Sequence, residues 1–422
     1  MKNLLFLLVV ALIPLNIWAK SYQVNQWEVL ELTFNLKSNS NNPFNEIMGC
    51  SFTAPNGNQL SIPGYYVGNK QWRVRFTPNE PGNWKCTSYA SNRGLSGISH
   101  EVEVLPARPG NHGGLVISKE NPELLAYEDG KPYNLLAFEF DWLFALDYGK
   151  QDLTRSEHFI KTIKENGFNQ VIMNVFAFDV SWEKDPDLAN AHEFGGNLQI
   201  FPFNGTNQIP DHSQLNLEFF DHLDKVVALL NEHQLVAHLM IYVWNKQVNW
   251  PESNSSQDNL YFDYIIKRYQ AFPNVLWDIS KEALGYGHDD IDYITQRIDR
   301  LRGLDAYDRL VTVHDYGYCA KFPEKVDIIS IQSWNTDLYQ RMKDVKSTHA
   351  GKPVFNIEHG GYEKSPYEVF KGNYDDPEVC LFRNYLCAFT GAYSTYYWQG
   401  SSWNVIIPDP FATDVEPQPK FS

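Results

Sequence analysis

From about residue 134, apolar runs of strand length alternate regularly with amphipathic stretches of helical periodicity. Parallel strands that are covered on both faces are apolar throughout, and a helix usually connects each strand to the next. Eight such runs can be identified: NLLAFEF near 134, NQVIMNVFAF near 169, LVAHLMIYVW near 235, NVLWDIS near 274, RLVTVHDY near 309, VDIISIQSW near 326, KPVFNIEHG near 352 and AYSTYYWQG near 392. Eight strand and helix units predict an α/β fold of the (β/α)8 type, a TIM barrel.

The connections between these runs differ in length. In LTRSEHFIKTIKENG, Phe159, Ile160 and Ile163 share one helical face, and Gly167 ends the helix. A long insertion with SWEKD and IFPFNG separates the second and third runs, whereas the fifth and sixth leave room for a turn but not for a full helix. A short, Pro-rich segment follows the eighth run, and no sequence for an eighth covering helix can be identified. Either the barrel is closed differently or the chain is truncated.

The residues before the barrel show a different pattern. Segments such as WEVLELTFNL, QWRVRFTP and HEVEVLP alternate apolar and polar residues and are separated by Gly, Asn and Pro turns. This pattern predicts a small all-β sandwich of the immunoglobulin-like type over residues 20–106. We expect a linker at 107–114 and the barrel over 115–422.

Residues 1–19 have the features of a secretory signal peptide. Lys2 precedes an apolar run from Leu4 to Leu15, and Ala19 supplies a small residue for cleavage. No later stretch approaches the roughly 20 apolar residues that a membrane helix needs. We therefore expect an exported protein, periplasmic or secreted, without membrane insertion.

Charge and missing motifs exclude several classes of function. The net charge of −16 disfavours nucleic acid as a partner, because phosphate backbones would be repelled. The chain contains no GxSxG elbow, no GxGxxG fingerprint and no Walker sequence, so serine hydrolase and nucleotide chemistry are not indicated. No cofactor is expected.

The five cysteines do not form a recognisable framework. An odd number excludes complete pairing, and Cys319, Cys380 and Cys387 lack the spacing of a zinc site. Cys50 and Cys86 lie in neighbouring predicted strands, where a disulfide and two buried thiols are both open. We predict no structural metal.

Two glutamates stand at ends of predicted barrel strands, where barrel enzymes place their catalytic groups. Glu282 follows the fourth strand in NVLWDISKEA, and Glu358 ends the seventh in KPVFNIEHG. Hydrolysis of a glycosidic bond with retention needs one carboxylic acid to protonate the leaving oxygen and one carboxylate to attack the anomeric carbon. Structural alternatives are a solvated carboxylate at a helix start for Glu282 and an ion pair for Glu358.

The same segments resemble a known clan. NVLWDISKEA is similar to the "W-D-(hydrophobic)-x-N-E" strand end of the retaining (β/α)8 glycoside hydrolases, and PVFNIEHG is similar to that clan's nucleophile strand. With DGKPYNLLAFEFDW behind a β-sandwich, the chain resembles bacterial proteins that join an immunoglobulin-like module of unassigned function to an apiosidase-like or cellulase-like barrel. The resemblance implies Glu282 as acid/base and Glu358 as nucleophile. Lys281 departs from it, since the clan has Asn there; the lysine either binds an anionic group of the substrate or pairs with a neighbouring acid.

Other strand ends supply candidate substrate-binding residues, by aromatic stacking or by hydrogen bonds to hydroxyl groups. These are Asp141, Trp142, Asn174, Tyr242, Trp244, Lys281, His314, Gln332, Trp334, His359 and Trp398. Trp398, Trp334 and His314 are the strongest candidates, because their strand ends flank the two glutamates.

The sequence thus predicts an exported hydrolase, a retaining glycosidase that acts on a carbohydrate substrate such as a plant or algal polysaccharide fragment, without indicating which sugar or linkage. The alternative is a non-catalytic carbohydrate-binding protein on a degenerate barrel. Two glutamates at these strand ends argue against that alternative, because binding alone needs neither.

Overall fold

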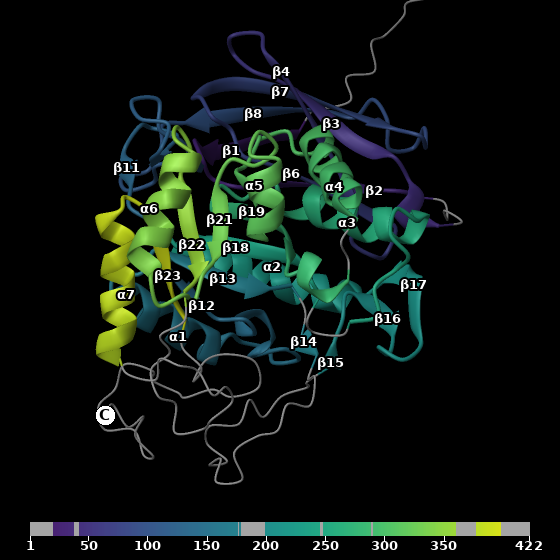
Figure 1. Ribbon diagram of the computed structural model, residues 1–422. Helices are drawn as coiled ribbons and strands as arrows, with labels where there is room; N and C mark the ends of the chain where they lie inside the picture. Colours follow the sequence, from purple (N-terminus) through teal and green to yellow (C-terminus); the bar gives the residue numbers. More distant parts are fainter. Residues whose placement is uncertain are drawn as a thin grey trace, which may run out of the picture.

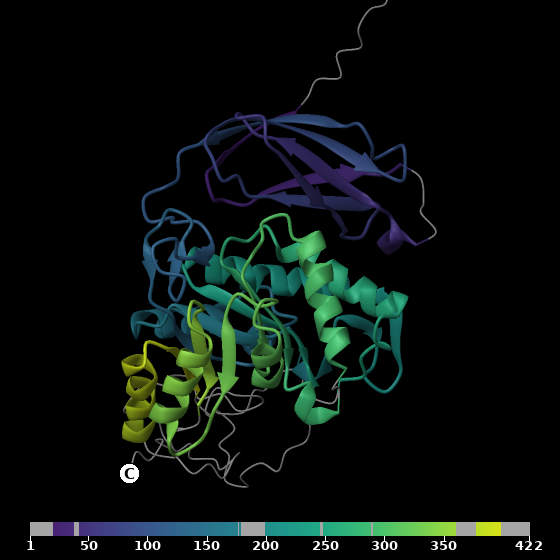
Figure 2. The ribbon, with the colours of Figure 1, turned by 45° about the horizontal axis from the view of Figure 1, so that its top comes forward.

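The computed structural model describes residues 20–37, 42–175, 177–178, 199–244, 248–287, 290–359 and 377–397. They form a β-sandwich stacked on an α/β barrel (Figures 1 and 2). The predicted signal peptide and the segment after the eighth strand lie outside these residues. Among the helices of the described part, none is long and apolar enough to cross a membrane.

The N-terminal unit consists of two packed sheets. One has the order β1(Lys20–Asn25), β8(Ser99–Leu105), β7(Gly82–Ala90), β3(Met48–Thr53), β4(Gln59–Pro63), and the other has the order β2(Leu30–Asn35), β6(Gln71–Phe76), β5(Tyr65–Tyr66). Alternate residues point inward, so that Phe52 and Phe76 stack between the sheets with ring centroids 4.0 Å apart. Cys50 and Cys86 lie on neighbouring strands as buried free thiols; their registers differ, since Cys86 lies opposite Phe52. The predicted β-sandwich is confirmed.

A small sheet connects the two units. It contains β9(Leu115–Ile117), β10(Leu125–Tyr127) and β11(Pro132–Tyr133) and precedes the first barrel strand.

The barrel is a sheet of eight parallel strands, as predicted. Its order is β20(Val311–His314), β19(Val275–Lys281), β18(Val236–Val243), β13(Gln170–Asn174), β12(Leu136–Glu139), β23(Tyr393–Tyr397), β22(Val354–Glu358), β21(Ile329–Gln332). The first and last strands of this order, β20 and β21, are joined by side chains. Thr312 Oγ1 donates to the Ile328 carbonyl at 2.9 Å and lies 2.7 Å from Ser330 Oγ. The barrel is therefore nearly closed.

Helices cover the outside of the barrel (Figure 1). They are α1(Thr154–Glu165), α2(Leu217–Glu232), α3(Ser256–Tyr269), α4(Ile291–Leu304), α5(Tyr316–Lys321), α6(Leu338–Thr348) and α7(Pro377–Phe389), with short 3-10 turns η2(Leu143–Ala145) and η5(Leu284–Tyr286). On α1, Phe159, Ile160 and Ile163 are buried together, as the pattern predicts, and Gly167 takes a φ of 90° beyond its end. Between the fifth and sixth strands the chain forms α5, a helix of only 6 residues.

The insertion between the second and third strands is partly described. It forms the pairs β14(Ala177–Phe178) with β15(Gln199–Ile200), and β16(Phe203–Gly205) with β17(Pro210–Leu215). The SWEKD part lies outside the described residues.

The sandwich contacts the barrel at the end where the strands begin (Figure 2). Arg75 of β6 is buried there and donates to Asp224 of α2 and to the Arg268 carbonyl of α3 at 2.8 Å. Tyr264 donates its hydroxyl to the Tyr66 carbonyl at 2.5 Å. Because these contacts are buried and polar, they fix the relative position of the two units. The loops that follow the barrel strands lie at the opposite end, where the strands finish.

Candidate active site

The two predicted catalytic glutamates come to the same end of the barrel. Glu358 is the last residue of β22, and Glu282 directly follows β19. They are near enough for the charge of Glu282 to raise the pKa of Glu358. Their exposure differs, since Glu358 is 5% exposed and Glu282 is half-buried.

Glu282 adopts an unusual backbone conformation. Its φ is 58°, in the left-handed region that side chains other than glycine rarely adopt. The pairing between β19 and β20 shifts register between Asp278 and Lys281, and the Glu282 amide then donates to the His314 carbonyl at 3.2 Å. The strand thus ends in a bulge that turns Glu282 out of the regular ladder. Strain of this kind concentrates at functional sites.

Asp278 holds this bulge from inside the barrel. Its Oδ1 accepts from the backbone amides of Ser280 at 3.2 Å and His314 at 3.0 Å, and its Oδ2 lies 3.0 Å from Nε2 of His238. Gln170 Nε2 lies 3.0 Å from Nδ1 of the same imidazole. The carboxylate therefore joins the two strands on both sides of the irregular pairing.

Lys281 is an internal cation. Only 4% of it is exposed, and its Nζ lies 2.8 Å from Glu139 Oε1 and 3.0 Å from Glu358 Oε2. Of the two alternatives at this position, the structure shows pairing with neighbouring acids. A buried ammonium needs such partners, because burial of an isolated charge is very unfavourable.

The pKa values in this cluster follow from burial and charge. Burial raises the pKa of Glu358; the Lys281 charge acts in the opposite direction, and Glu282 and Asp141 add to the rise. Burial likewise raises the pKa of Glu139 well above its usual range, against the effect of Lys281. For Lys281 itself burial would lower the pKa, but Glu139 and Glu358 outweigh it and raise the value, so that the ammonium stays charged.

Asp141, His314 and Gln332 belong to the same neighbourhood. Asp141 follows β12 and is buried, and its charge influences the pKa values of Glu139, Lys281 and Glu358. His314 ends β20 with Nε2 3.8 Å from Glu358 Oε2. Burial, and then the Lys281 charge, lower the pKa of His314 well below its usual range, while the Gln332 side chain acts in the opposite direction. His314 is thus a neutral imidazole beside Glu358.

Further predicted residues surround this end of the barrel. Asn174 ends β13, and its buried side-chain amide has no hydrogen-bond partner among the described residues. His359 follows Glu358, is buried, and accepts from Arg383 Nε at 2.8 Å through its carbonyl. Trp142 is buried at the start of η2, and Trp334 is half-buried beyond β21. Trp398 lies outside the described residues.

Tyr242 packs into the helix layer, and Trp244 contacts Ser280, two positions before Glu282. The Tyr242 hydroxyl donates to Asp258 of α3 at 2.5 Å, and its ring packs against Tyr261 and Tyr293 of the helix layer. Trp244 stacks on Tyr242 with centroids 5.5 Å apart and donates to Ser280 Oγ at 2.9 Å. A position at a strand end does not determine which face the side chain occupies, and Tyr242 occupies the face covered by helices.

Glu139 is a residue of this cluster that the sequence pattern did not single out. It is fully buried at the end of β12, in direct contact with Lys281. The available signal was a single charge inside the otherwise apolar run NLLAFEF, because an acid in such a strand requires a buried partner.

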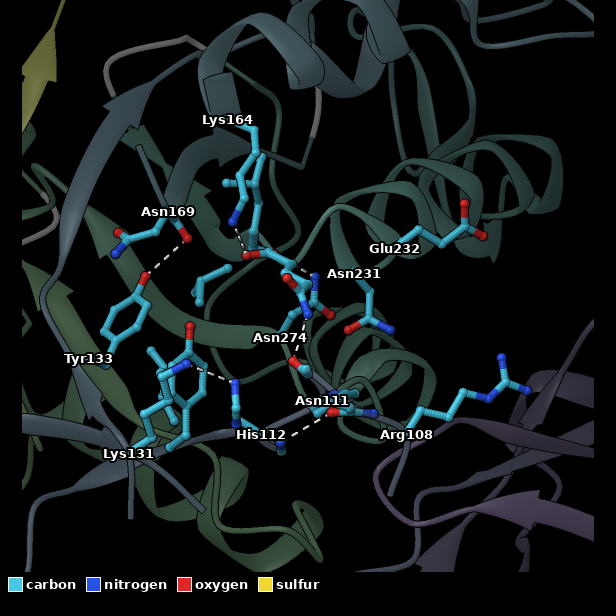
Figure 3. Close-up of a pocket in the computed structure, with 18 of the residues that line it drawn as sticks. Arg108, Asn111, His112, Lys131, Tyr133, Lys164, Asn169, Asn231, Glu232 and Asn274 are labelled. Atoms are coloured by element: carbon cyan, nitrogen blue, oxygen red, sulfur yellow. Dashed lines mark hydrogen bonds between the residues drawn. The ribbon is translucent and has the colours of Figure 1, made fainter. Parts of the chain in front are cut away.

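The pocket in Figure 3 lies elsewhere. It has a volume of about 680 Å³ and is lined by the linker and by residues where barrel strands begin, among them Lys131, Lys164, Asn169, Asn231 and Asn274. This end of the barrel is opposite to Glu282 and Glu358. Among the described residues, no group of three or more His, Cys, Asp or Glu side chains could hold a metal ion.

Comparison with known proteins identifies the family. Residues 119–412 match the family described as "Apiosidase-like, catalytic domain", which spans more than half of the chain. The chain belongs to the apiosidase-like family. Residues 23–91 match a domain of unknown function, DUF5060. Both matches agree with the resemblance found in the sequence, and no curated protein matches the chain significantly.

Solved structures with a similar fold are glycoside hydrolases by name. A candidate glycoside hydrolase from Bacteroides vulgatus is 22% identical with a TM-score of 0.76, over 95% of this chain and 79% of that protein. Another glycoside hydrolase is 16% identical with a TM-score of 0.51, over 72% of this chain and 68% of that one. A family 5 mannosidase from Rhizomucor miehei is 13% identical with a TM-score of 0.48, over 68% and 86%. The first two similarities establish the shared fold for this member of the apiosidase-like family.

Proposed function

We propose that this apiosidase-like protein is an exported, retaining glycoside hydrolase with Glu282 as acid/base and Glu358 as nucleophile. The observation that carries the proposal is the asymmetry between two carboxyl groups at one end of the barrel. Glu358 is almost fully buried with an ammonium 3.0 Å away, whereas Glu282 is half-buried on a strained bulge. The family match and the glycoside hydrolase fold support the same reading.

The asymmetry suits two different tasks. A nucleophile must be ionised when the substrate arrives, and the neighbouring Lys281 charge favours the carboxylate form of Glu358. An acid/base must exchange protons with the leaving group and with water, which requires access, and Glu282 is the more accessible group.

The proposed reaction has two steps. Glu282 gives its proton to the glycosidic oxygen while a Glu358 oxygen attacks the anomeric carbon; the bond to the leaving group breaks and a glycosyl ester forms. Glu282, now a carboxylate, takes a proton from water, and the resulting hydroxide attacks the same carbon and releases Glu358. The anomeric configuration is inverted twice and therefore retained.

The substrate we propose is a carbohydrate, a poly- or oligosaccharide fragment of plant or algal origin. Export to the periplasm or the medium, proposed from residues 1–19, would bring the enzyme to such a polymer. Lys281 gives no support for an anionic sugar, because its ammonium is buried and pairs with Glu139 and Glu358 of the described part of the chain.

The test is hydrolysis of a panel of polysaccharides and aryl glycosides by the wild type and by Glu282→Ala and Glu358→Ala, with product anomers followed by NMR. We expect the wild type to release its product with retained configuration. Glu282→Ala should lose about 10²–10⁴-fold in turnover, and Glu358→Ala should be inactive because the glycosyl ester cannot form. Azide should restore turnover in Glu282→Ala, because it can attack the glycosyl enzyme without a general base. Glu324→Ala, an exposed acid away from the strand ends, is the control and should behave as wild type.

Two results would contradict the proposal. Inverted product would exclude Glu358 as a nucleophile. Binding of a glycan by the wild type and both variants, with no cleavage of any substrate, would instead establish a carbohydrate-binding protein.

A further inference from the structure

Glu139 is a buried carboxyl group for which the proposed mechanism has no task. It ends β12, which in the sheet is separated from β19 by β18 and β13, and from β22 by β23. Lys281 Nζ donates to Glu139 Oε1 at 2.8 Å and also contacts Glu358 at 3.0 Å. The ammonium therefore joins three separate strands across the inside of the barrel.

The second contact matters because of the chemistry of lysine. Its ammonium sits at the end of a flexible four-carbon side chain that can adopt many rotamers. Contact with one carboxylate alone would therefore not fix its position. Glu139 is fully buried, and its other oxygen, Oε2, has no hydrogen-bond partner among the described residues. Within that part of the chain, Lys281 is the hydrogen-bond partner of this carboxyl group.

We propose that Glu139 is a positioning residue: it anchors the ammonium of Lys281 so that Lys281 holds the Glu358 carboxylate in place for attack on the anomeric carbon. This inference rests on the proposed function. An attacking oxygen must approach to about 3–3.5 Å in line with the breaking bond, and displacement by about 1 Å can cost a hundredfold in rate. Glu139 acts on Glu358 only through Lys281.

The experiment compares Glu139→Gln and Glu139→Met in the full mature chain, on the substrate that the panel of glycosides identifies. Gln has nearly the same shape as Glu and keeps an oxygen that can accept the Lys281 hydrogen bond. Met fills the same space but has no oxygen acceptor. For Glu139→Met we expect kcat to fall about 10- to 100-fold with little change in KM. Glu139→Gln should restore most of kcat.

A second measurement tests the route through Lys281. If Glu139 acts through this ammonium, Glu139→Met should have no further effect on kcat in a Lys281→Met background, since coupled residues are not additive. Asp305→Asn is the matched control. It is a buried acid near the start of β19, bonded to Trp277 at 3.0 Å and remote from Glu358, and its kcat should be that of wild type.

The results separate this inference from the proposed function. It is overturned if Glu139→Met keeps wild-type kcat while Glu358→Ala is inactive, or if the effects of Glu139→Met and Lys281→Met on kcat simply multiply. A fall in kcat shared equally by Asp305→Asn would also overturn it, because the loss would then reflect general destabilisation. Wild-type activity of Glu358→Ala would instead refute the proposed function, and this inference with it.

Discussion

Because the backbone at Glu282 is left-handed, we expect a glycine variant at this position to be more stable than an alanine variant. A residue with a β-carbon pays about 1–2 kcal/mol for this conformation, and glycine does not. We expect Glu282→Gly to have a free energy of unfolding about 1 kcal/mol higher than Glu282→Ala, and both variants to lack the proposed acid/base. Urea unfolding followed by circular dichroism measures the difference. Equal or lower stability of the glycine variant would show that the bulge does not strain this residue.

Replacement of Lys281 should change the pH dependence of kcat/KM. Its charge lowers the pKa of Glu358, a group whose pKa burial has raised. Loss of the charge in Lys281→Met should therefore raise the pKa further, so that the nucleophile becomes protonated at higher pH. The acidic limb of kcat/KM should therefore move to higher pH. Lys281→Arg, which keeps the charge, should move the limb less, and a downward shift in Lys281→Met would refute the assigned role.

At the scale of the element, the end of β19 depends on Asp278. Its carboxylate accepts from two backbone amides on β19 and β20 and faces His238, all within the barrel. Asp278→Leu would leave these buried donors without an acceptor, at about 1–3 kcal/mol each. We expect a loss of at least about 3 kcal/mol in the free energy of unfolding, and lower kcat because the bulge carries Glu282. Asp278→Asn keeps one acceptor oxygen and should lose less in a parallel urea titration.

The arrangement of strands and helices also explains which site residues could be predicted from the sequence. Glu282 and Glu358 follow apolar runs long enough to be recognised as strands, and parallel strands must all end on one side of a barrel. Tyr242 satisfies the same rule and yet packs against α3 and α4. The pattern of a strand shows where it ends, but the facing helices decide which side a large ring occupies.

For the whole molecule, the sandwich and the barrel share a buried ionic cluster. Asp224 of α2 lies between Arg75 of the sandwich and Arg268 of α3, and both guanidinium groups are buried. Burial alone would raise the pKa of Asp224, but the two arginines lower it well below its usual range. A carboxyl group with a lowered pKa contributes stability above its unfolded value of about 3.9, and that contribution is lost on strong acidification.

Removal of Arg75 should therefore loosen the contact between the two units. We expect Arg75→Met to lower the free energy of unfolding by about 3–5 kcal/mol at neutral pH, because it breaks a buried ion pair. Arg73→Met is a close control, since Arg73 lies two residues away on β6 and forms a partly exposed pair with Glu31 at 3.1 Å, worth about 1 kcal/mol or less. Activity on a small aryl glycoside should be unchanged in both, because the interface lies at the other end of the barrel. An equal effect of the two substitutions on urea unfolding would contradict this role.

The eight-stranded barrel, the β-sandwich before it and the positions of two glutamates at strand ends could be predicted from the sequence. These follow from apolar periodicity and from the direction of parallel strands, which are local properties of the chain. The folded barrel was needed to show that Lys281 faces inward, that Glu139 contacts it from another strand, and that Tyr242 belongs to the helix layer. Glu139 and Lys281 are 142 positions apart, and the free energy of a buried charge depends on what surrounds it in space. The separation of Glu139 and Lys281 along the sequence therefore gave no indication that the two side chains are in contact in the folded barrel.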